Sequence, residues 1–187
     1  MRYAITGGIG SGKSFYCRKL EAAGFPIFYC DDEAKRIIRT SVAVRQQLCA
    51  LVGNEVYDTD GHLQKPVLAA YLCRGKAFAE KVDAIVHPRV AEAFQEWADE
   101  KSKVHDKVFM ECALLYESGF EYLVDEVILV TASEETRVRR VMARDGVTRE
   151  KALAWIALQM PEAEKRMRAH HIINSENDGQ LEGMLFV

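Results

Sequence analysis

The chain has 187 residues, of which 49% are hydrophobic and 28% charged, and its formal net charge is −3. This length suits one domain, and the composition is that of a globular protein rather than a disordered or membrane-embedded one. A slightly acidic balance gives no general attraction to nucleic acid or to an anionic membrane surface, so neither is an expected partner.

The cysteines and the first residues indicate a cellular compartment. The five cysteines are odd in number and form no Cys-x-x-Cys pair, so neither a disulfide framework nor a zinc site is indicated. No apolar run approaches the ~18 residues of a membrane span. The first strand leads within a few residues into a glycine-rich loop and leaves no room for a cleavable signal. We therefore expect a cytoplasmic protein whose thiols stay reduced.

The apolar run 3–5 is followed at once by residues 6–14, which read TGGIGSGKS. The spacing Gly-x4-Gly-Lys-Ser is typical of a phosphate-binding loop, in which backbone N–H groups cradle phosphate oxygens. Lys13 can reach the β- and γ-phosphates, and the Ser14 hydroxyl can ligate Mg²⁺. The helix that follows adds its positive N-terminal end. The loop therefore predicts a bound nucleoside triphosphate with Mg²⁺, lined by Gly8, Gly10, Ser11 and Gly12.

The next elements complete a β-α-β unit. Apolar spacing predicts a helix over 13–23 that ends at Gly24, and the apolar run 25–30 predicts a second buried strand. Ligands of open parallel sheets lie beyond the carboxyl ends of the strands. Asp31, directly after this strand, is thus expected to face the loop and to accept a proton from an acceptor hydroxyl or hold the metal's water shell. Paired aspartates can also be a helix cap or solvated charge, which is the favoured interpretation of Asp32.

Residues 33–103 carry helical patterns and no convincing strand, so we expect a helical excursion. Its last helix should begin near Pro88, because proline suits a first helical position. Arg89 could hold an anionic substrate beside His87, although a His-Pro helix start is equally compatible with a structural role.

Two further apolar runs, 108–115 and 126–131, predict the third and fourth strands of a parallel sheet, and Ile172 with Ile173 a short fifth. Glu111, inside the third strand, resembles the acidic residue that often faces Mg²⁺ beside such a loop. A buried carboxylate there needs a partner, and the metal site is one candidate.

Residues 133–169 are expected to form a helical lid. Ser133 is a suitable N-cap for a helix reaching about Arg144, Thr148 caps a further helix, and Pro161 opens another. The segment is rich in arginine, which matches phosphate geometry.

Arg137, Arg140 and Arg144 fall on one face of the first lid helix, at spacings of three and four. A solvated basic face is one interpretation of this pattern. Lids that close over a γ-phosphate use arginines, so at least one should be functional. We select Arg140 and Arg144.

Other nucleotide-binding classes have motifs that can be sought directly. The Asn-Lys-x-Asp motif of GTPases and the Leu-Ser-Gly-Gly-Gln signature of transporter ATPases are both missing from the sequence. Its size, its helical excursion and its arginine-rich segment favour a small-metabolite or nucleotide kinase. A nucleotide-binding module without turnover remains the alternative from another class.

The loop 6–14 is very similar to the opening of dephospho-coenzyme A kinases, and further stretches resemble that family. Residues 29–31 occupy its Asp-Ala-Asp motif, which singles out Asp31 as the base. The family's Asp-Gly-x-Leu, His-Pro, Pro-Leu-Leu-Phe-Glu and lid motifs resemble residues 60–63, 87–89, 113–117 and 140–166. Departures are Phe15 for Thr, Ala113 for Pro, Tyr29 for Asp and His170 for Asp.

The resemblance covers nearly the whole chain. It implies an enzyme that transfers the γ-phosphate of ATP to the ribose 3′-hydroxyl of dephospho-CoA, the last step of coenzyme A synthesis. A nucleoside monophosphate or shikimate-type kinase is the runner-up, since it shares loop, fold and lid.

These observations predict an α/β protein with a P-loop NTPase fold: a five-stranded parallel sheet flanked by helices, with a helical substrate-binding insert and a lid. The single domain 1–187 divides into a core of about 1–31, 104–132 and 170–187, an acceptor-binding insert of about 32–103, and the lid. A monomer or small homo-oligomer is expected. The predicted catalytic residues are Asp31, Lys13 and Arg140. Phe15 and Arg144 are expected to bind ATP together with the loop, and His87 and Arg89 to bind the substrate. Ser14 is expected to ligate Mg²⁺ directly, and Glu111 to contact the ion through its bound waters.

Overall fold

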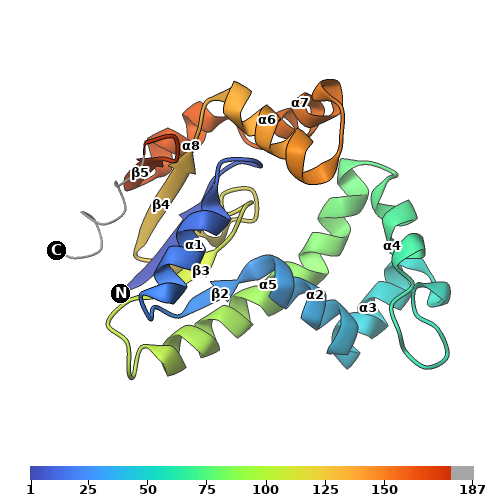
Figure 1. Ribbon diagram of the computed structural model, residues 1–187. Helices are drawn as coiled ribbons and strands as arrows, with labels where there is room; N and C mark the ends of the chain where they lie inside the picture. Colours follow the sequence, from blue (N-terminus) through green and yellow to red (C-terminus); the bar gives the residue numbers. More distant parts are fainter. Residues whose placement is uncertain (178–187) are drawn as a thin grey trace. The chain divides into compact units, whose positions relative to one another are not determined.

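The computed structural model describes residues 1–177. Its strands are β1 (Arg2–Thr6), β2 (Ile27–Tyr29), β3 (Val108–Glu111), β4 (Glu126–Thr131) and β5 (His171–Asn174). They form one five-stranded parallel sheet in the order β2-β3-β1-β4-β5 (Figure 1). The fold is therefore the predicted one, a parallel sheet flanked by helices with the glycine-rich loop after the central strand.

The helices of the first half are α1 (Lys13–Ala22), α2 (Cys30–Thr40), α3 (Val42–Val52), α4 (Lys65–Leu72) and α5 (Lys76–Lys101), with a 3₁₀ turn η1 (Asn54–Val56). The second half has η2 (Phe120–Leu123), α6 (Glu134–Asp145), α7 (Arg149–Ala157) and α8 (Glu162–Arg168). The predicted caps are confirmed: Ser133 and Thr148 accept hydrogen bonds from Thr136 and Lys151 N–H.

The sheet places its central strands in the core. Ala4 of β1 lies opposite Met110 of β3 and Val127 of β4, and all three are buried. Side chains of a parallel sheet are covered on both faces, which is why these strands read as continuous apolar runs. β3 is shorter than the predicted run, because Cys112 N–H makes a last hydrogen bond to Ile5 O before the chain turns away.

The prediction that a helix begins near Pro88 is wrong. α5 runs without interruption through Pro88, although proline removes one backbone hydrogen bond and costs about 3 kcal/mol inside a helix. Buried residues recur at every fourth position on both sides of it, so packing on one continuous face offsets that cost. These residues are Val82, Val86, Val90, Phe94 and Ala98.

Contacts divide the chain into two compact units: Met1–Phe28 with the residues from Trp97 onward, and Tyr29–Glu96. The first unit contains most of the sheet, the glycine-rich loop and the lid segment, residues 133–169. The second is helical, and within it the Tyr57 hydroxyl donates to Ile38 O at 2.6 Å. The predicted core segment 170–187 extends beyond the described residues.

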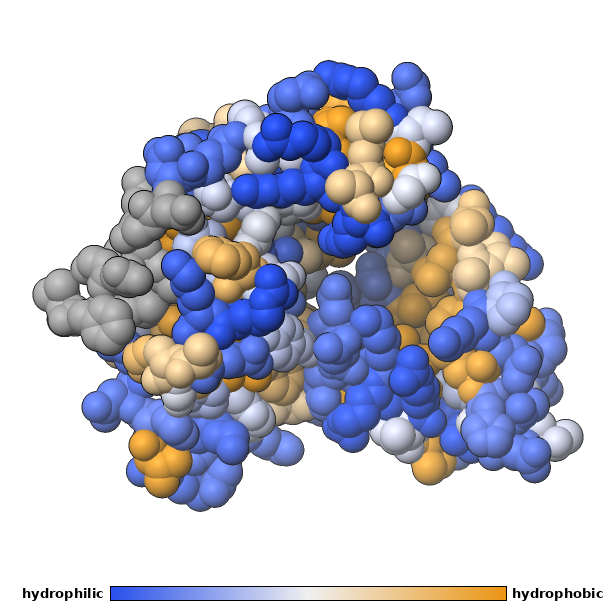
Figure 2. All heavy atoms as spheres, viewed as in Figure 1, coloured by the Kyte–Doolittle hydropathy of each residue, from blue (hydrophilic) through white to orange (hydrophobic). Residues whose placement is uncertain are grey.

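The surface is mainly hydrophilic on the face drawn in Figure 2. Exposed large apolar side chains such as Val104, Leu158 and Met167 come from separate parts of the sequence. In residues 1–177, we find no helix that is both long and apolar enough to cross a membrane.

Candidate active site

The loop between β1 and α1 has the backbone shape of a phosphate cradle. Gly10 and Gly12 adopt φ of 77° and 97°, in the left-handed region that glycine favours. Ser11 N–H donates to Gly8 O at 3.0 Å, and Phe15 N–H donates to Gly12 O at 3.0 Å. α1 begins at Lys13, so the positive end of its dipole points at the loop.

Lys13, at the start of α1, forms an ion pair with Glu111, at the end of β3. The Lys13 Nζ lies 3.3 Å from Glu111 Oε1, and the two side chains are only 11% and 12% exposed. Below them, burial and the charge of Glu111 raise the pKa of the Cys17 thiol to about 12. Cys17 is therefore a protonated, unreactive thiol at neutral pH. This state agrees with the prediction that the thiols of the protein stay reduced.

The oxygen atoms at this point suit a magnesium ion. Ser14 is exposed in the first turn of α1, and Glu111 offers a carboxylate at the end of β3. Mg²⁺ prefers hard oxygen ligands and keeps several of its waters, and a hydroxyl and a carboxylate are ligands of that kind.

Two lid arginines contact the loop. Arg140 donates from Nη1 to Gly10 O and Ser11 O at 3.2 Å, and to Ser175 Oγ at 2.7 Å. Arg137 is buried and donates from Nε to Ile9 O at 3.0 Å. Sequence reasoning selected Arg140 and passed over Arg137, although their shared helix face was the available signal.

Arg144, the other selected arginine, is placed differently. Its side chain is 62% exposed and pairs with the neighbouring Asp145, which raises the pKa of Arg144. Its contribution to nucleotide binding stays a prediction.

Glu176, which follows β5, accepts hydrogen bonds from residues at the start of α6. Glu176 accepts hydrogen bonds from Ser133 N–H, the Ser133 hydroxyl and the Thr136 hydroxyl. Hydrogen bonds from Thr136 and Ser133 lower the pKa of Glu176 to about 2. The carboxylate thus completes the cap of α6, and sequence reasoning missed it because the contact joins residues far apart in the chain.

A buried ion pair holds the far end of the lid segment. Lys165 is 1% exposed, and its Nζ lies 2.9 Å from Glu117 Oε1. The same oxygen of Glu117 accepts from Met160 N–H at 2.9 Å. Burial works to raise the pKa of Glu117, but the hydrogen bonds from Lys165 and Met160 outweigh it and lower that pKa.

The remaining predicted residues lie on the surface. Asp31 and Asp32 are exposed in the first turn of α2, where Asp32 pairs with Lys35 at 3.0 Å. Phe15 is 43% exposed, with Lys19 Nζ 4.8 Å from its ring centre. In α5, His87 Nε2 lies 3.5 Å from Asp83, and Arg89 pairs with Glu92 at 2.8 Å.

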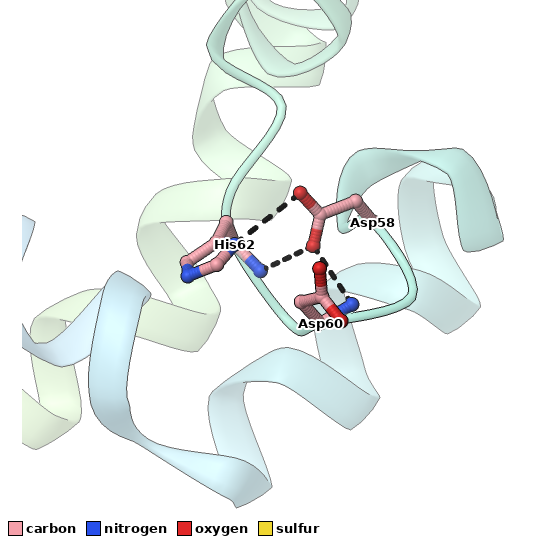
Figure 3. Close-up of side chains that lie close together, drawn as sticks. All are labelled: Asp58, Asp60 and His62. Carbon is pink, nitrogen blue, oxygen red and sulfur yellow. Dashed lines mark hydrogen bonds and ion pairs between the residues drawn. The ribbon is translucent and has the colours of Figure 1, made fainter.

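Figure 3 shows a second group of polar side chains, Asp58, Asp60 and His62, around the turn over residues 58–61. Asp58 Oδ1 accepts from Asp60 N–H at 3.0 Å and from His62 N–H at 2.8 Å. Its Oδ2 lies 3.4 Å from His62 Nδ1. These bonds close the turn, so the exposed cluster has a structural explanation.

Comparison with known proteins identifies the family. A family model described as dephospho-CoA kinase matches residues 1–182. The chain belongs to the dephospho-CoA kinase family. A dephospho-CoA kinase of Bacteroides fragilis is 42% identical to this chain over 180 residues, which cover 96% of the chain and 86% of the relative.

Solved structures agree with the fold. A crystal structure of a Thermus thermophilus protein is 37% identical, has a TM-score of 0.80 and is matched over 97% of this chain and 91% of its own. A dephospho-CoA kinase from Campylobacter jejuni is 22% identical, with a TM-score of 0.70 and coverages of 97% and 90%, and supports the fold alone.

Proposed function

We propose that this family member transfers the γ-phosphate of ATP to the ribose 3′-hydroxyl of dephospho-CoA, giving coenzyme A and ADP. Its relationship to dephospho-CoA kinases over nearly the whole chain carries the proposal. The cradle at Gly10 and Gly12, with Lys13 beside it, supports the ATP half of the reaction.

On the nucleotide side, backbone N–H groups of the loop would bind the phosphates, and Lys13 would balance charge that develops on the transferred group. When bound at Ser14 and, through its waters, at Glu111, Mg²⁺ would neutralise the phosphate oxygens. Phe15, Arg140 and Arg144 would complete the nucleotide site.

On the acceptor side, Asp31 would accept the proton of the ribose hydroxyl as it attacks phosphorus. Its exposed carboxylate lies in the first turn of α2, two residues after β2 ends, and ligands of parallel sheets bind beyond the carboxyl ends of the strands. His87 and Arg89, in α5, would bind anionic parts of the acceptor. Closure of the lid segment would exclude water that otherwise hydrolyses ATP.

A panel of acceptors tests the proposal. Purified protein with Mg·ATP would receive dephospho-CoA, AMP, CMP or shikimate, and both ADP and the phosphorylated product would be quantified. We expect product only with dephospho-CoA. Product with a nucleoside monophosphate or with shikimate would favour the corresponding kinase. ATP binding without turnover on any acceptor would favour a non-catalytic nucleotide-binding module.

A further inference from the structure

Ile9, in the middle of the phosphate loop, is held by the lid segment through three separate contacts. Its N–H donates to Gln159 Oε1 at 2.7 Å, after the end of α7. Its carbonyl oxygen accepts from Arg137 Nε at 3.0 Å, on α6. Its side chain packs against the small core between these helices, formed by Val138, Val141 and Ala152.

Arg137 is placed with little freedom. Its side chain is 9% exposed, and its Nη1 lies 3.5 Å from Glu162 Oε2. Burial lowers the pKa of Arg137, which reflects the cost of removing a guanidinium from water. A charged group buried at such cost is stable only with hydrogen-bonded partners, and here the partners are the loop carbonyl and a carboxylate of α8.

The guanidinium also fills the space beside the loop. A Cβ on Gly8 would come within 2.3 Å of Arg137 Nη2, and a Cβ on Gly10 within 2.6 Å of Arg137 O. Gly8 and Gly10 therefore allow α6 to pack directly on the loop backbone, a role additional to their closeness to phosphate.

The hydrogen bond to Ile9 O orients the next N–H. A trans peptide is planar, so its carbonyl and its N–H point in opposite directions. Because Arg137 holds the Ile9 carbonyl, Gly10 N–H points away from Arg137. Arg140 does the same for Gly12 N–H through the Ser11 carbonyl.

We infer that Arg137 and Gln159 are positioning residues for phosphate binding: they hold the peptide groups of Ile9 so that the inner N–H groups of the loop are oriented before phosphate binds. Ile9 shares its apolar cluster with Trp155 of α7, so the fluorescence of that indole reports on the packing of the loop against the lid segment. The inference rests on the proposed function only in requiring that the loop binds phosphates.

The test uses inorganic triphosphate with Mg²⁺, a probe that can engage the loop but not a base or ribose site. Arg137→Lys keeps the charge but loses the planar fork, whereas Arg139→Lys makes the same change at an exposed position of α6. Calorimetry should show about a tenfold loss of triphosphate affinity for Arg137→Lys, which corresponds to ~1.4 kcal/mol. Arg139→Lys should bind like the unaltered protein.

Gln159→Met provides a second test, because methionine cannot accept the Ile9 N–H with comparable strength. Leu158→Met is its control, since Leu158 is 83% exposed and one residue away. In a Trp97→Phe background Trp155 is the sole tryptophan, and its fluorescence reports whether the loop stays packed on the lid segment. Gln159→Met should change that fluorescence in the protein without triphosphate and should reduce the triphosphate affinity, and Leu158→Met should change neither.

The outcomes separate positioning from simple stabilisation. A variant with a lowered melting temperature but unaltered triphosphate affinity, measured well below that temperature, would make Arg137 and Gln159 structural and overturn the inference. A Gln159→Met variant with unaltered Trp155 fluorescence and unaltered triphosphate affinity would also overturn it. If these binding effects are found but dephospho-CoA is not phosphorylated, the proposed function fails and the positioning role stands.

Discussion

Glu111 lies beside Lys13, the lysine of the phosphate loop, and its carboxylate has two effects on the candidate site. It neutralises Lys13, and it places a carboxylate where oxygen ligands of a magnesium ion are expected. Both effects depend on its charge rather than on its size, so the amide is the informative replacement.

Glu111→Gln should therefore raise the Mg²⁺ concentration needed for half-maximal phosphate transfer. Residues behind the ligands of a metal typically contribute about tenfold or more to its affinity, which sets the expected size. A Mg²⁺ titration of the transfer rate measures it. Glu126→Gln, on β4, is the control, because Glu126 pairs with His171 rather than with Lys13. Equal Mg²⁺ requirements in the two variants would contradict a role for Glu111 near the metal.

Gly10 combines backbone strain with close packing. Its φ of 77° disfavours any side chain, and an alanine Cβ would meet the main chain of Arg137. Gly10→Ala should lower the free energy of unfolding by about 3 kcal/mol or more and abolish triphosphate binding. Gly24→Ala has a similar φ of 88° but no atom within 4 Å, so it should cost only about 1–2 kcal/mol. Urea unfolding compares the two, and equal costs would show that the packing contributes nothing.

At the scale of elements, two adjacent residues that follow β5 hold α6 at two places along its length. Ser175 bonds Arg140 in the middle of the helix, and Glu176 bonds Ser133 and Thr136 at its start. The orientation of the lid helix thus depends on residues that follow β5.

Glu176 should make the stability of the protein depend on acidity. Its folded pKa of about 2 lies below its ordinary value of 4.5. A lowered folded pKa stabilises the fold above the unfolded pKa, and this contribution is lost as the pH falls from about 4.5 toward 2. Urea unfolding at several pH values should show Glu176→Gln less stable than the unaltered protein at pH 7, with the difference shrinking below pH 4.5. A difference that stays constant across this range would contradict the assignment.

Pro88 is tolerated in α5 at a cost that alanine should recover. Pro88→Ala restores a helical N–H and should raise the free energy of unfolding by about 1–3 kcal/mol. Pro66→Ala is a matched control, because Pro66 stands in the first turn of α4, where no helical N–H is needed. Urea unfolding measures both. A loss of stability in Pro88→Ala would mean that the surrounding residues pack around a bend made by the proline.

At the scale of the whole molecule, the residues proposed for the two halves of the reaction belong to different units. The phosphate loop and lid segment belong to the first unit, and Asp31 belongs to the second. Binding of ATP and activation of the acceptor should therefore be separable by mutation.

Asp31→Asn should leave the affinities for triphosphate and ATP unchanged while lowering kcat by roughly 10²–10⁴-fold, the range expected for loss of a general base. Asp32→Asn, one residue further and paired with Lys35, should retain nearly full kcat. Calorimetry and steady-state rates give the two quantities. Normal turnover by Asp31→Asn would remove this carboxylate from the mechanism.

Local sequence patterns predict the parts of this fold that local chemistry determines. The caps at Ser133 and Thr148 need only a side chain and the next turn, and β4 needs only its apolar run. The continuity of α5 through Pro88 depends on packing along its whole length, which a helix-start rule ignores.

The same distinction applies to the candidate site. The loop could be predicted from its glycines and Lys13, because its motif is contiguous. Arg137 could not be separated from Arg144, since helix periodicity places both on one face and only tertiary packing brings one of them to Ile9. Glu176 carries no motif at all, because its partners lie some forty residues earlier in the chain.

The close packing of α6 on Gly8 and Gly10 has a consequence for transplantation between proteins. A loop from another nucleotide-binding enzyme that carries side chains at the positions of Gly8 and Gly10 would place them in the space that Arg137 now fills. Such a chimera would have to exchange α6 together with the loop. The two segments, separated by most of the sequence, behave as a single interchangeable part.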